Sequence, residues 1–199
     1  MVEHSVLRID DLHVSAGRGA DAPAILKGIS LSIAAGETLC LVGESGSGKS
    51  VTSLATMGLL PKNILVPKSG RILLEGQDIL TRTERQIKAL RANRMAMIFQ
   101  EPMTALNPVM PVGRQIEEVL QAHTRLGASE RRKKVLDMLD QVHLPEIERV
   151  YRSFPHQLSG GQRQRIMIAM ALVLQPKLLI ADEPTTALDV TTQKEILRL

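Results

Sequence analysis

Aromatic residues are nearly absent from this chain. Its 199 residues include no tryptophan, one tyrosine and two phenylalanines. Proteins that bind single-stranded nucleic acid usually stack bases on aromatic side chains. The net charge of +4 is modest, and the densest basic run, residues 131–134, begins a helical pattern that predicts a solvated face. Scarce aromatics and modest charge together argue against a nucleic-acid-binding protein.

Cysteine is also scarce, because Cys40 is the only one. A single cysteine cannot form an internal disulfide, which fits a reducing compartment. Cys40 lies in the apolar run of residues 38–42, so we expect its side chain in the core.

Long hydrophobic runs are missing as well. The most apolar window, residues 169–181, is interrupted by Gln175, Pro176 and Lys177, and is therefore not predicted to span a bilayer. The first residues lack the basic and apolar regions of a signal peptide. Any role at a membrane is expected to be peripheral.

What is present is an ordinary globular composition, with 44% hydrophobic and 23% charged residues. The length favours one compact core carrying a smaller insertion. Alternation predicts a strand over 29–33, and short apolar runs with their flanking turn residues predict strands over 6–14, 38–42, 71–75, 95–99 and 177–181, the last as a buried strand. Helices are predicted from Ser50 to Pro61, from Thr83 with a capping box at Gln86, within 102–155, and after Gly161.

Residues 43–50, Gly-Glu-Ser-Gly-Ser-Gly-Lys-Ser, follow a predicted strand and open a predicted helix. This spacing is the phosphate-binding P-loop (Walker A) pattern. Glycine permits the positive φ angles that turn backbone N–H groups toward phosphate oxygens at a helix N-terminus. Lys49 is predicted to contact the β- and γ-phosphates, and Ser50 to bind Mg²⁺. The predicted nucleotide-binding set here is Gly43, Glu44, Ser45, Gly46, Ser47, Gly48, Lys49, Ser50 and Val51.

Two adjacent carboxylates, Asp182 and Glu183, end the apolar run of residues 178–181. Buried acids are costly without a cation, so Asp182 is predicted to hold Mg²⁺. Strand alternation points Glu183 away from Asp182, where it is placed to orient or deprotonate an attacking water. Without a P-loop in the same chain, the simple start of a helix would be the better interpretation.

A third motif, Leu158-Ser-Gly-Gly-Gln162, precedes a helix that is apolar almost all round. Ser159 is predicted to cap this helix, whose N-terminus is a potential anion site. By itself the motif is equally well explained as a well-capped core helix. A P-loop, this motif and the Asp-Glu pair, in this order, resemble the ABC ATPase superfamily.

The resemblance covers about residues 6–195 and implies further roles. Ser159, Gly160, Gly161 and Gln162 would close over a nucleotide held by a second subunit, which implies a head-to-tail dimer. Gln100 resembles the Q-loop glutamine that contacts Mg²⁺ or the attacking water, although a loop cap is its default interpretation. Asp189 resembles the D-loop aspartate, although a helix cap explains it equally well.

Residues 101–108 and 154–159 resemble the subgroup of bacterial importers for peptides or nickel. This resemblance implies an ATP-binding and ATP-hydrolysing subunit at the cytoplasmic face of the inner membrane. Its implied partners are a second ATPase subunit, identical or related, two transmembrane permeases and, indirectly, an extracytoplasmic solute-binding protein. No nucleic acid is expected as a partner.

Two departures from the family pattern stand out. No aromatic residue in 12–26 is available to stack on adenine; Ala16 lies near the expected place, and Ile25 is a candidate aliphatic contact. The family's switch histidine follows the D-loop, whereas the histidines here all precede residue 182. We therefore expect a fragment of a longer protein or a truncated product with impaired hydrolysis.

The predicted fold is an α/β, RecA-like P-loop NTPase core of the ABC type, with an N-terminal antiparallel β portion and an α-helical insertion. Its predicted parts are residues 1–100 with the P-loop, a helical subdomain over 101–160, and a return to the core over 161–199. Two alternatives stay open: a soluble ABC ATPase acting on nucleic acid or ribosomes, and a remnant that binds ATP without turnover.

Overall fold

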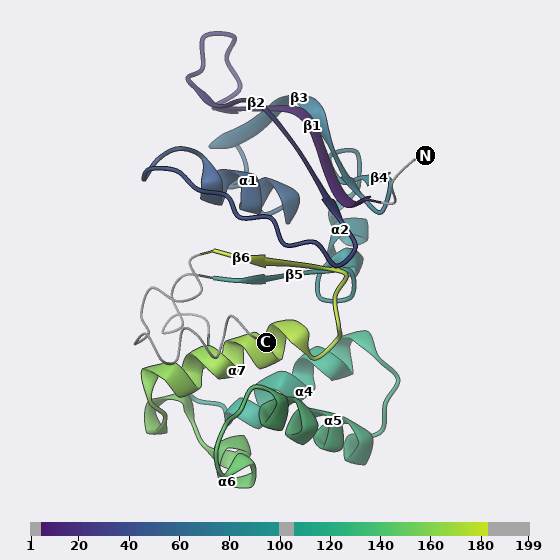
Figure 1. Cartoon of the computed structure of the whole chain (residues 1–199), viewed down its shortest axis with the longest axis vertical. Helices are drawn as coiled ribbons and strands as arrows, with labels where there is room; N and C mark the ends of the chain where they lie inside the picture. Colours follow the sequence, from purple (N-terminus) through teal and green to yellow (C-terminus); the bar gives the residue numbers. More distant parts are fainter. Residues whose placement is uncertain (1–4, 100–105, 183–199) are drawn as a thin grey trace. The chain divides into compact units, whose positions relative to one another are not determined.

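A computed structural model describes residues 5–99 and 106–182. The predicted site residues Gln100 and Glu183, together with Asp189, lie outside these ranges. The chain divides into two compact units, residues 1–91 and 92–199 (Figure 1). The division into three functional parts at residues 100 and 160 stays a prediction.

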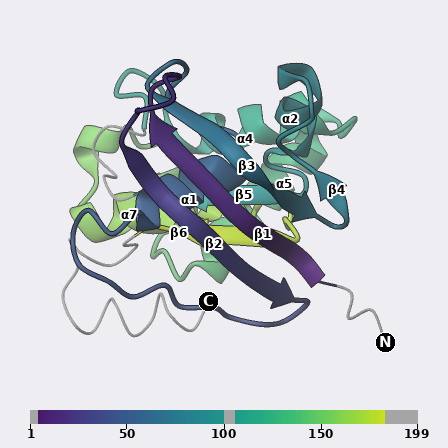
Figure 2. The ribbon, with the colours of Figure 1, turned by 90° about the horizontal axis from the view of Figure 1, so that it is seen from above.

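The first unit contains a four-stranded antiparallel sheet in the order β2-β1-β3-β4. Figure 2 shows β1 between β2 and β3. The strands are β1 (Ser5–Ala16), β2 (Ala24–Ala34), β3 (Leu65–Leu74) and β4 (Gln77–Asp78). The strands predicted over 6–14, 29–33 and 71–75 are confirmed as parts of β1, β2 and β3, each of which is longer than predicted. The antiparallel β portion predicted for the N-terminal region is therefore present.

A bulge in β1 interrupts both of its ladders. Asp10 pairs with Arg71 and His13 with Ser69, so two residues of β1 oppose Gly70 alone. Asp11 takes a φ of +47° at this point, and its N–H donates to the Ser30 hydroxyl at 2.9 Å. The side-chain hydroxyl thereby replaces a ladder acceptor that the bulge removes.

Two helices complete the first unit, α1 (Lys49–Thr56) and α2 (Glu84–Leu90). The predicted capping box of α2 is confirmed, because the Thr83 hydroxyl accepts from Gln86 N–H and the Gln86 side chain accepts from Thr83 N–H. Helix α1 ends earlier than predicted. Gly58 takes a φ of +63°, and this left-handed residue ends the helix before Pro61 is reached.

The second unit pairs β5 (Met95–Ile98) with β6 (Leu178–Ala181) in parallel register, and carries four α-helices among its described residues. The helices are α4 (Val112–His123), α5 (Ala128–Gln141), α6 (Ile147–Arg152) and α7 (Gly160–Leu172). A short 3₁₀ turn, Pro155–Gln157, connects α6 to α7. The predicted helical insertion is confirmed, and parallel strands with helices fit the predicted α/β class.

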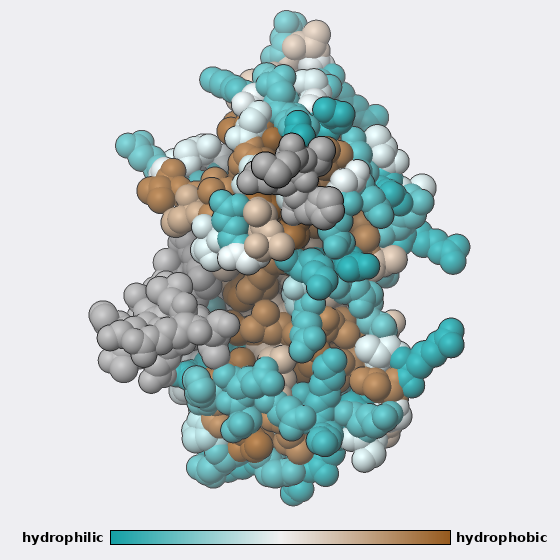
Figure 3. Space-filling view, turned by 45° about the vertical axis from the view of Figure 1, so that its right-hand side comes forward, coloured by the Kyte–Doolittle hydropathy of each residue, from teal (hydrophilic) through white to brown (hydrophobic). Residues whose placement is uncertain are grey.

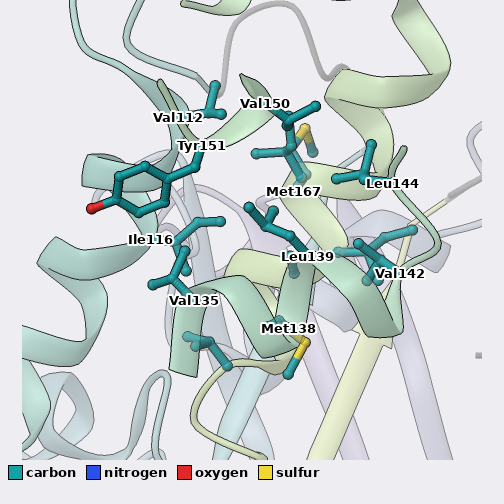
Figure 4. Close-up of a cluster of buried hydrophobic side chains, with 14 of the residues drawn as sticks. Val112, Ile116, Val135, Met138, Leu139, Val142, Leu144, Val150, Tyr151 and Met167 are labelled. Carbon is teal, nitrogen blue, oxygen red and sulfur yellow. The ribbon is translucent and has the colours of Figure 1, made fainter. Parts of the chain in front are cut away.

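The helices of this unit enclose one apolar cluster (Figure 4). Its fully buried members include Val112, Ile116, Val135, Leu139 and Val150. They recur at helical spacing, as the sequence pattern predicted. On the face seen in Figure 3, hydrophilic side chains cover much of the lower half of the view, with smaller hydrophobic patches between them.

The prediction of a buried strand over residues 38–42 was wrong. These residues form no strand; Cys40 is exposed, and 89% of Val42 is exposed. Burial of the β6 strand was also overestimated, since Leu178 is buried but Leu179 is exposed. The physical reason is common to both segments: an apolar run becomes a buried strand only where neighbouring strands and helices cover it.

Candidate nucleotide-binding site

The P-loop leads directly into the N-terminus of α1. Gly46 and Gly48 have φ angles of +81° and +95°, values that favour glycine. A Cβ atom on Gly48 would also lie 2.5 Å from Cδ2 of Leu26. The backbone conformation therefore favours the glycine that the motif predicted at this position, and any larger residue would also displace the Leu26 side chain.

Lys49 reaches back across this loop. Its Nζ donates to the carbonyl oxygens of Gly43 at 2.7 Å and Glu44 at 2.9 Å. The first N–H groups of a helix have no partner within it and lie at its positive end. A cation bound to the loop and the positive end of a helix beside it form an arrangement suited to phosphate oxygens. The remaining predicted residues, Ser45, Ser47, Ser50 and Val51, belong to the same loop and first helical turn.

The two predicted magnesium ligands within the described ranges belong to different units. Ser50 lies in the first turn of α1, and Asp182 directly follows β6. The N–H of Asp182 donates to the carbonyl of Ile98 at 3.0 Å, which continues the parallel ladder by one residue. Hydroxyl and carboxylate oxygens are ligands that Mg²⁺ accepts, so the donor chemistry of both residues fits this ion.

Ser159 caps α7 as predicted. Its hydroxyl accepts from Gln162 N–H at 3.2 Å, while Gln162 Oε1 accepts from Ser159 N–H at 3.0 Å. This capping box leaves Gly160 and Gly161 in the first turn, and a Cβ on Gly160 would meet no atom within 4 Å. The exposed Gly160 therefore leaves room beside the first turn of the helix, whose positive end suits an anion.

Helix α7 is held to the end of α5 through Arg165, which lies in the second turn of α7. Arg165 Nη1 donates to the carbonyls of Val142 and His143 at 3.0 and 3.3 Å, at the end of α5. Further along, Ile166 and Ala169 are fully buried. The position of Ser159 and its neighbours is therefore set by packing within the second unit.

The residues near the expected adenine site contain no aromatic ring, as the sequence indicated. Ala16 is partly buried at the end of β1, and its N–H donates to the carbonyl of Pro23 at 2.8 Å. Ile25 in β2 is partly buried. The proposed aliphatic contact from Ile25 stays a prediction.

Sequence patterns missed two buried polar groups on α4, Gln115 and Glu117, which are 5% and 7% exposed. The Tyr151 hydroxyl donates to Glu117 Oε1 at 2.5 Å, and Arg114 pairs with the other carboxylate oxygen at 3.2 Å. Burial, followed by the hydrogen bond to Glu117, raises the pKa of Tyr151. Neither partner could be identified from the sequence, because Glu117 and Tyr151 are 34 residues apart.

The P-loop at the start of α1 and the capped glycine turn of α7 define a P-loop nucleotide-binding protein. The family model described as ABC transporter matches residues 26–186, and the chain belongs to this family. Among its described residues, no helix is both long and apolar enough to cross a membrane.

Similar proteins are named as transport ATP-binding proteins. The chain is 50% identical to the peptidoglycan transport ATP-binding protein YejF of Agrobacterium fabrum, over 98% of the chain and 36% of that protein. It is 47% identical to the oligopeptide transport ATP-binding protein OppD of Bacillus subtilis, over 98% of the chain and 54% of that protein. The chain thus spans only part of the length of these relatives.

A solved structure has the same fold. The ATP-binding cassette MJ0796, in a dimeric post-hydrolysis state with ADP and Pi, matches with a TM-score of 0.83 at 30% identity. The match covers 96% of this chain and 80% of that one.

Proposed function

We propose that this chain is the ATP-binding and ATP-hydrolysing part of an ABC importer subunit that powers peptide uptake. The observation that carries the proposal is the P-loop, where Gly46 and Gly48 adopt positive φ angles and the Lys49 ammonium donates to the carbonyls of Gly43 and Glu44. The names of the relatives, which include oligopeptide and dipeptide transport, support the cargo class. Nickel is the other cargo that the sequence resemblance implies.

Each site residue has a distinct role in this proposal. Backbone amides of residues 43–51 and the Lys49 ammonium bind the phosphates of ATP. Ser50, Asp182 and Gln100 hold Mg²⁺, which neutralises charge on the phosphate oxygens when it is bound. Glu183 orients or deprotonates the attacking water. Little covalent chemistry is asked of the protein, because hydrolysis depends mainly on positioning and charge stabilisation.

The second half of the site comes from a partner. Ser159, Gly160, Gly161 and Gln162 close over the nucleotide of a second ATPase subunit, which is identical or related. The pair acts on two transmembrane permeases from the cytoplasmic face of the bacterial inner membrane, and a solute-binding protein delivers the cargo outside. The dimeric state of the MJ0796 cassette supports an arrangement of two subunits.

Uptake in cells tests the proposed function. A strain without the full-length gene should lose uptake of a labelled oligopeptide and regain it with the wild-type gene. Lys49→Ala and Glu183→Gln, expressed at wild-type level, should not restore it. Uptake of labelled nickel in the same strains is the control for the other cargo. Unchanged peptide uptake in the deletion strain would contradict the proposal.

A further inference from the structure

The unit that carries the P-loop contains no phenylalanine, tyrosine or tryptophan. The chain has three such residues, Phe99, Tyr151 and Phe154, and all of them belong to the second unit. The imidazole of His13, in β1 of the first unit, is bound to Asp11 at 3.1 Å. Bases are commonly bound by stacking on aromatic faces. For an ATP held by the P-loop, a phenyl, phenol or indole ring is therefore available only from another unit.

A stacked pair of rings lies shortly before the Ser159 turn. The rings of Phe154 and His156 have their centroids 5.7 Å apart and their planes 19° from parallel. Phe154 is partly buried and covers one face of the imidazole, whereas His156 is exposed. Offset stacking of this kind can extend to a third ring, because each aromatic ring has two faces. The exposed imidazole is therefore suited to stack against a flat, aromatic ligand.

Hydrogen bonds and core contacts hold this pair in a fixed relation to Ser159. Phe154 N–H donates to Gln157 Oε1 at 2.8 Å, and Gln157 N–H donates to the Phe154 carbonyl at 3.0 Å. Leu158 N–H donates to the Pro155 carbonyl at 3.2 Å, and both of these residues are buried. Proline also restricts the backbone at the start of the 3₁₀ turn. The turn therefore connects the two rings to the N-terminus of α7 in one defined conformation.

His156 is near enough to Ser159 to act on the same nucleotide. It precedes Ser159 by three residues, which span at most about 11 Å. In ATP, the ribose and the triphosphate separate the base from the γ-phosphate by a similar length. A nucleotide whose phosphates meet the Ser159 turn can therefore place its base against His156.

We propose that His156, supported by Phe154, is a stacking platform for the base of the ATP held by a second subunit. This proposal rests on the proposed function, in which Ser159–Gln162 closes over that nucleotide. The base stacks on the exposed face of the imidazole, and the phenyl ring on the other face keeps the imidazole in place. The partner copy thus supplies the ring that the P-loop unit lacks. Purine nucleotides are favoured over pyrimidine nucleotides, because the larger ring system stacks over more area.

The test uses the full-length ATPase assembled with its partner subunit and permeases. KM and kcat for ATP and for UTP are measured for wild type, His156→Ala, His156→Asn and His156→Phe. The alanine and asparagine variants remove the ring, so they should raise KM for ATP about tenfold, raise KM for UTP less, and leave kcat unchanged. His156→Phe keeps an aromatic face and is the matched control, which should retain the wild-type KM for ATP.

Three results would overturn the stacking platform: an unchanged KM for ATP in His156→Ala, an equal rise in KM for ATP and UTP, or a loss in His156→Phe as large as that in His156→Ala. A fall in kcat in place of a rise in KM would overturn it as well, because it would indicate a structural role. Each of these results leaves the proposed function intact, since the wild-type complex still hydrolyses ATP. A wild-type complex that hydrolyses no ATP would overturn both.

Discussion

Lys49 is the residue on which nucleotide affinity should depend most. Its ammonium already lies over the loop, bound to the carbonyls of Gly43 and Glu44, and phosphate oxygens would replace these neutral acceptors with charged ones. Charge-assisted hydrogen bonds contribute about 1.5–3 kcal/mol. Lys49→Ala should therefore weaken ATP binding about tenfold or more, measured by isothermal titration of the full-length protein. Lys133→Ala, at an exposed position of α5, is the control and should bind as wild type; undiminished affinity in Lys49→Ala would contradict the P-loop assignment.

Glu183 should determine the rate of the chemical step. Its predicted role beside Asp182 is to activate water, and general-base catalysis contributes about 10²-fold or more. Glu183→Gln removes the base with almost no change in size. The full-length variant should bind ATP normally and hydrolyse it about 10²-fold more slowly, measured by phosphate release. Turnover at the wild-type rate would remove Glu183 as the base.

The pKa of the Tyr151 hydroxyl should differ between the folded and the unfolded chain. It is the only tyrosine, and burial with the Glu117 bond raises its pKa above the ordinary value. The neutral phenol is therefore favoured by folding. Its stabilising contribution is fully present below about pH 10 and is lost as pH rises through the higher folded pKa, because the unfolded chain releases the proton first.

Ultraviolet absorbance of tyrosinate measures this difference. Tyr151 in the folded protein should titrate above the pH at which it titrates in denaturant, and Tyr151→Phe should remove this component of the signal. Equal midpoints in the folded and unfolded chains would contradict the burial of this hydroxyl against Glu117.

At the scale of elements, the contact of β1 with β3 depends on Gly70. Its φ is +94°, and a Cβ atom would collide with backbone atoms of Asp10, Asp11 and Leu12 at the bulge. Backbone atoms of a paired strand cannot move aside as easily as the end of a flexible side chain. We expect Gly70→Ala to cost about 2–4 kcal/mol of unfolding free energy.

Gly76 provides a matched control for this substitution. It also has a positive φ, +78°, but a Cβ atom there would meet nothing within 4 Å. Gly76→Ala should therefore cost only about 1–2 kcal/mol, the price of the left-handed conformation. Urea unfolding of both variants measures the two costs; an equal loss would show that the bulge contact adds nothing.

Local patterns allowed many of these elements to be predicted. Thr83 with Gln86, and Ser159 with Gln162, form capping boxes because both partners lie within one helical turn. Alternation over 29–33 reflects a sheet with one covered face. The bulge opposite Gly70 left no such pattern, because its cause is a close approach between strands that are distant in sequence.

Residues 38–42 were wrongly predicted as a strand, although a clear local pattern was present. Its hydrophobicity was correctly recognised, but hydrophobicity does not specify which strands will cover a segment. Gln115 was missed for a related reason: a glutamine on an amphipathic helix is ordinarily exposed, and only the loop at Asn107 and Met110 explains its burial. In the site, motif spacing was enough to predict the glycine turn, Lys49 and the Ser159 cap. The buried polar groups on α4 could be identified only from the folded structure.

At the scale of the whole molecule, the two nucleotide-binding motifs belong to different compact units. The P-loop belongs to the unit with the antiparallel sheet, and the Ser159 turn is fixed to the helical cluster of the other unit. In the proposed dimer, each ATP is bound by the P-loop of one subunit and the Ser159 turn of the other.

In the proposed function, ATP turnover by this subunit is coupled to peptide import. The ATPase rate of the full-length protein, reconstituted with its permeases in vesicles, should be measured with and without peptide-loaded solute-binding protein. We expect the rate to rise when the loaded binding protein is added, and Glu183→Gln to abolish it. A rate that does not change with the loaded binding protein, or that survives Glu183→Gln, would show that turnover and import are not coupled in this way.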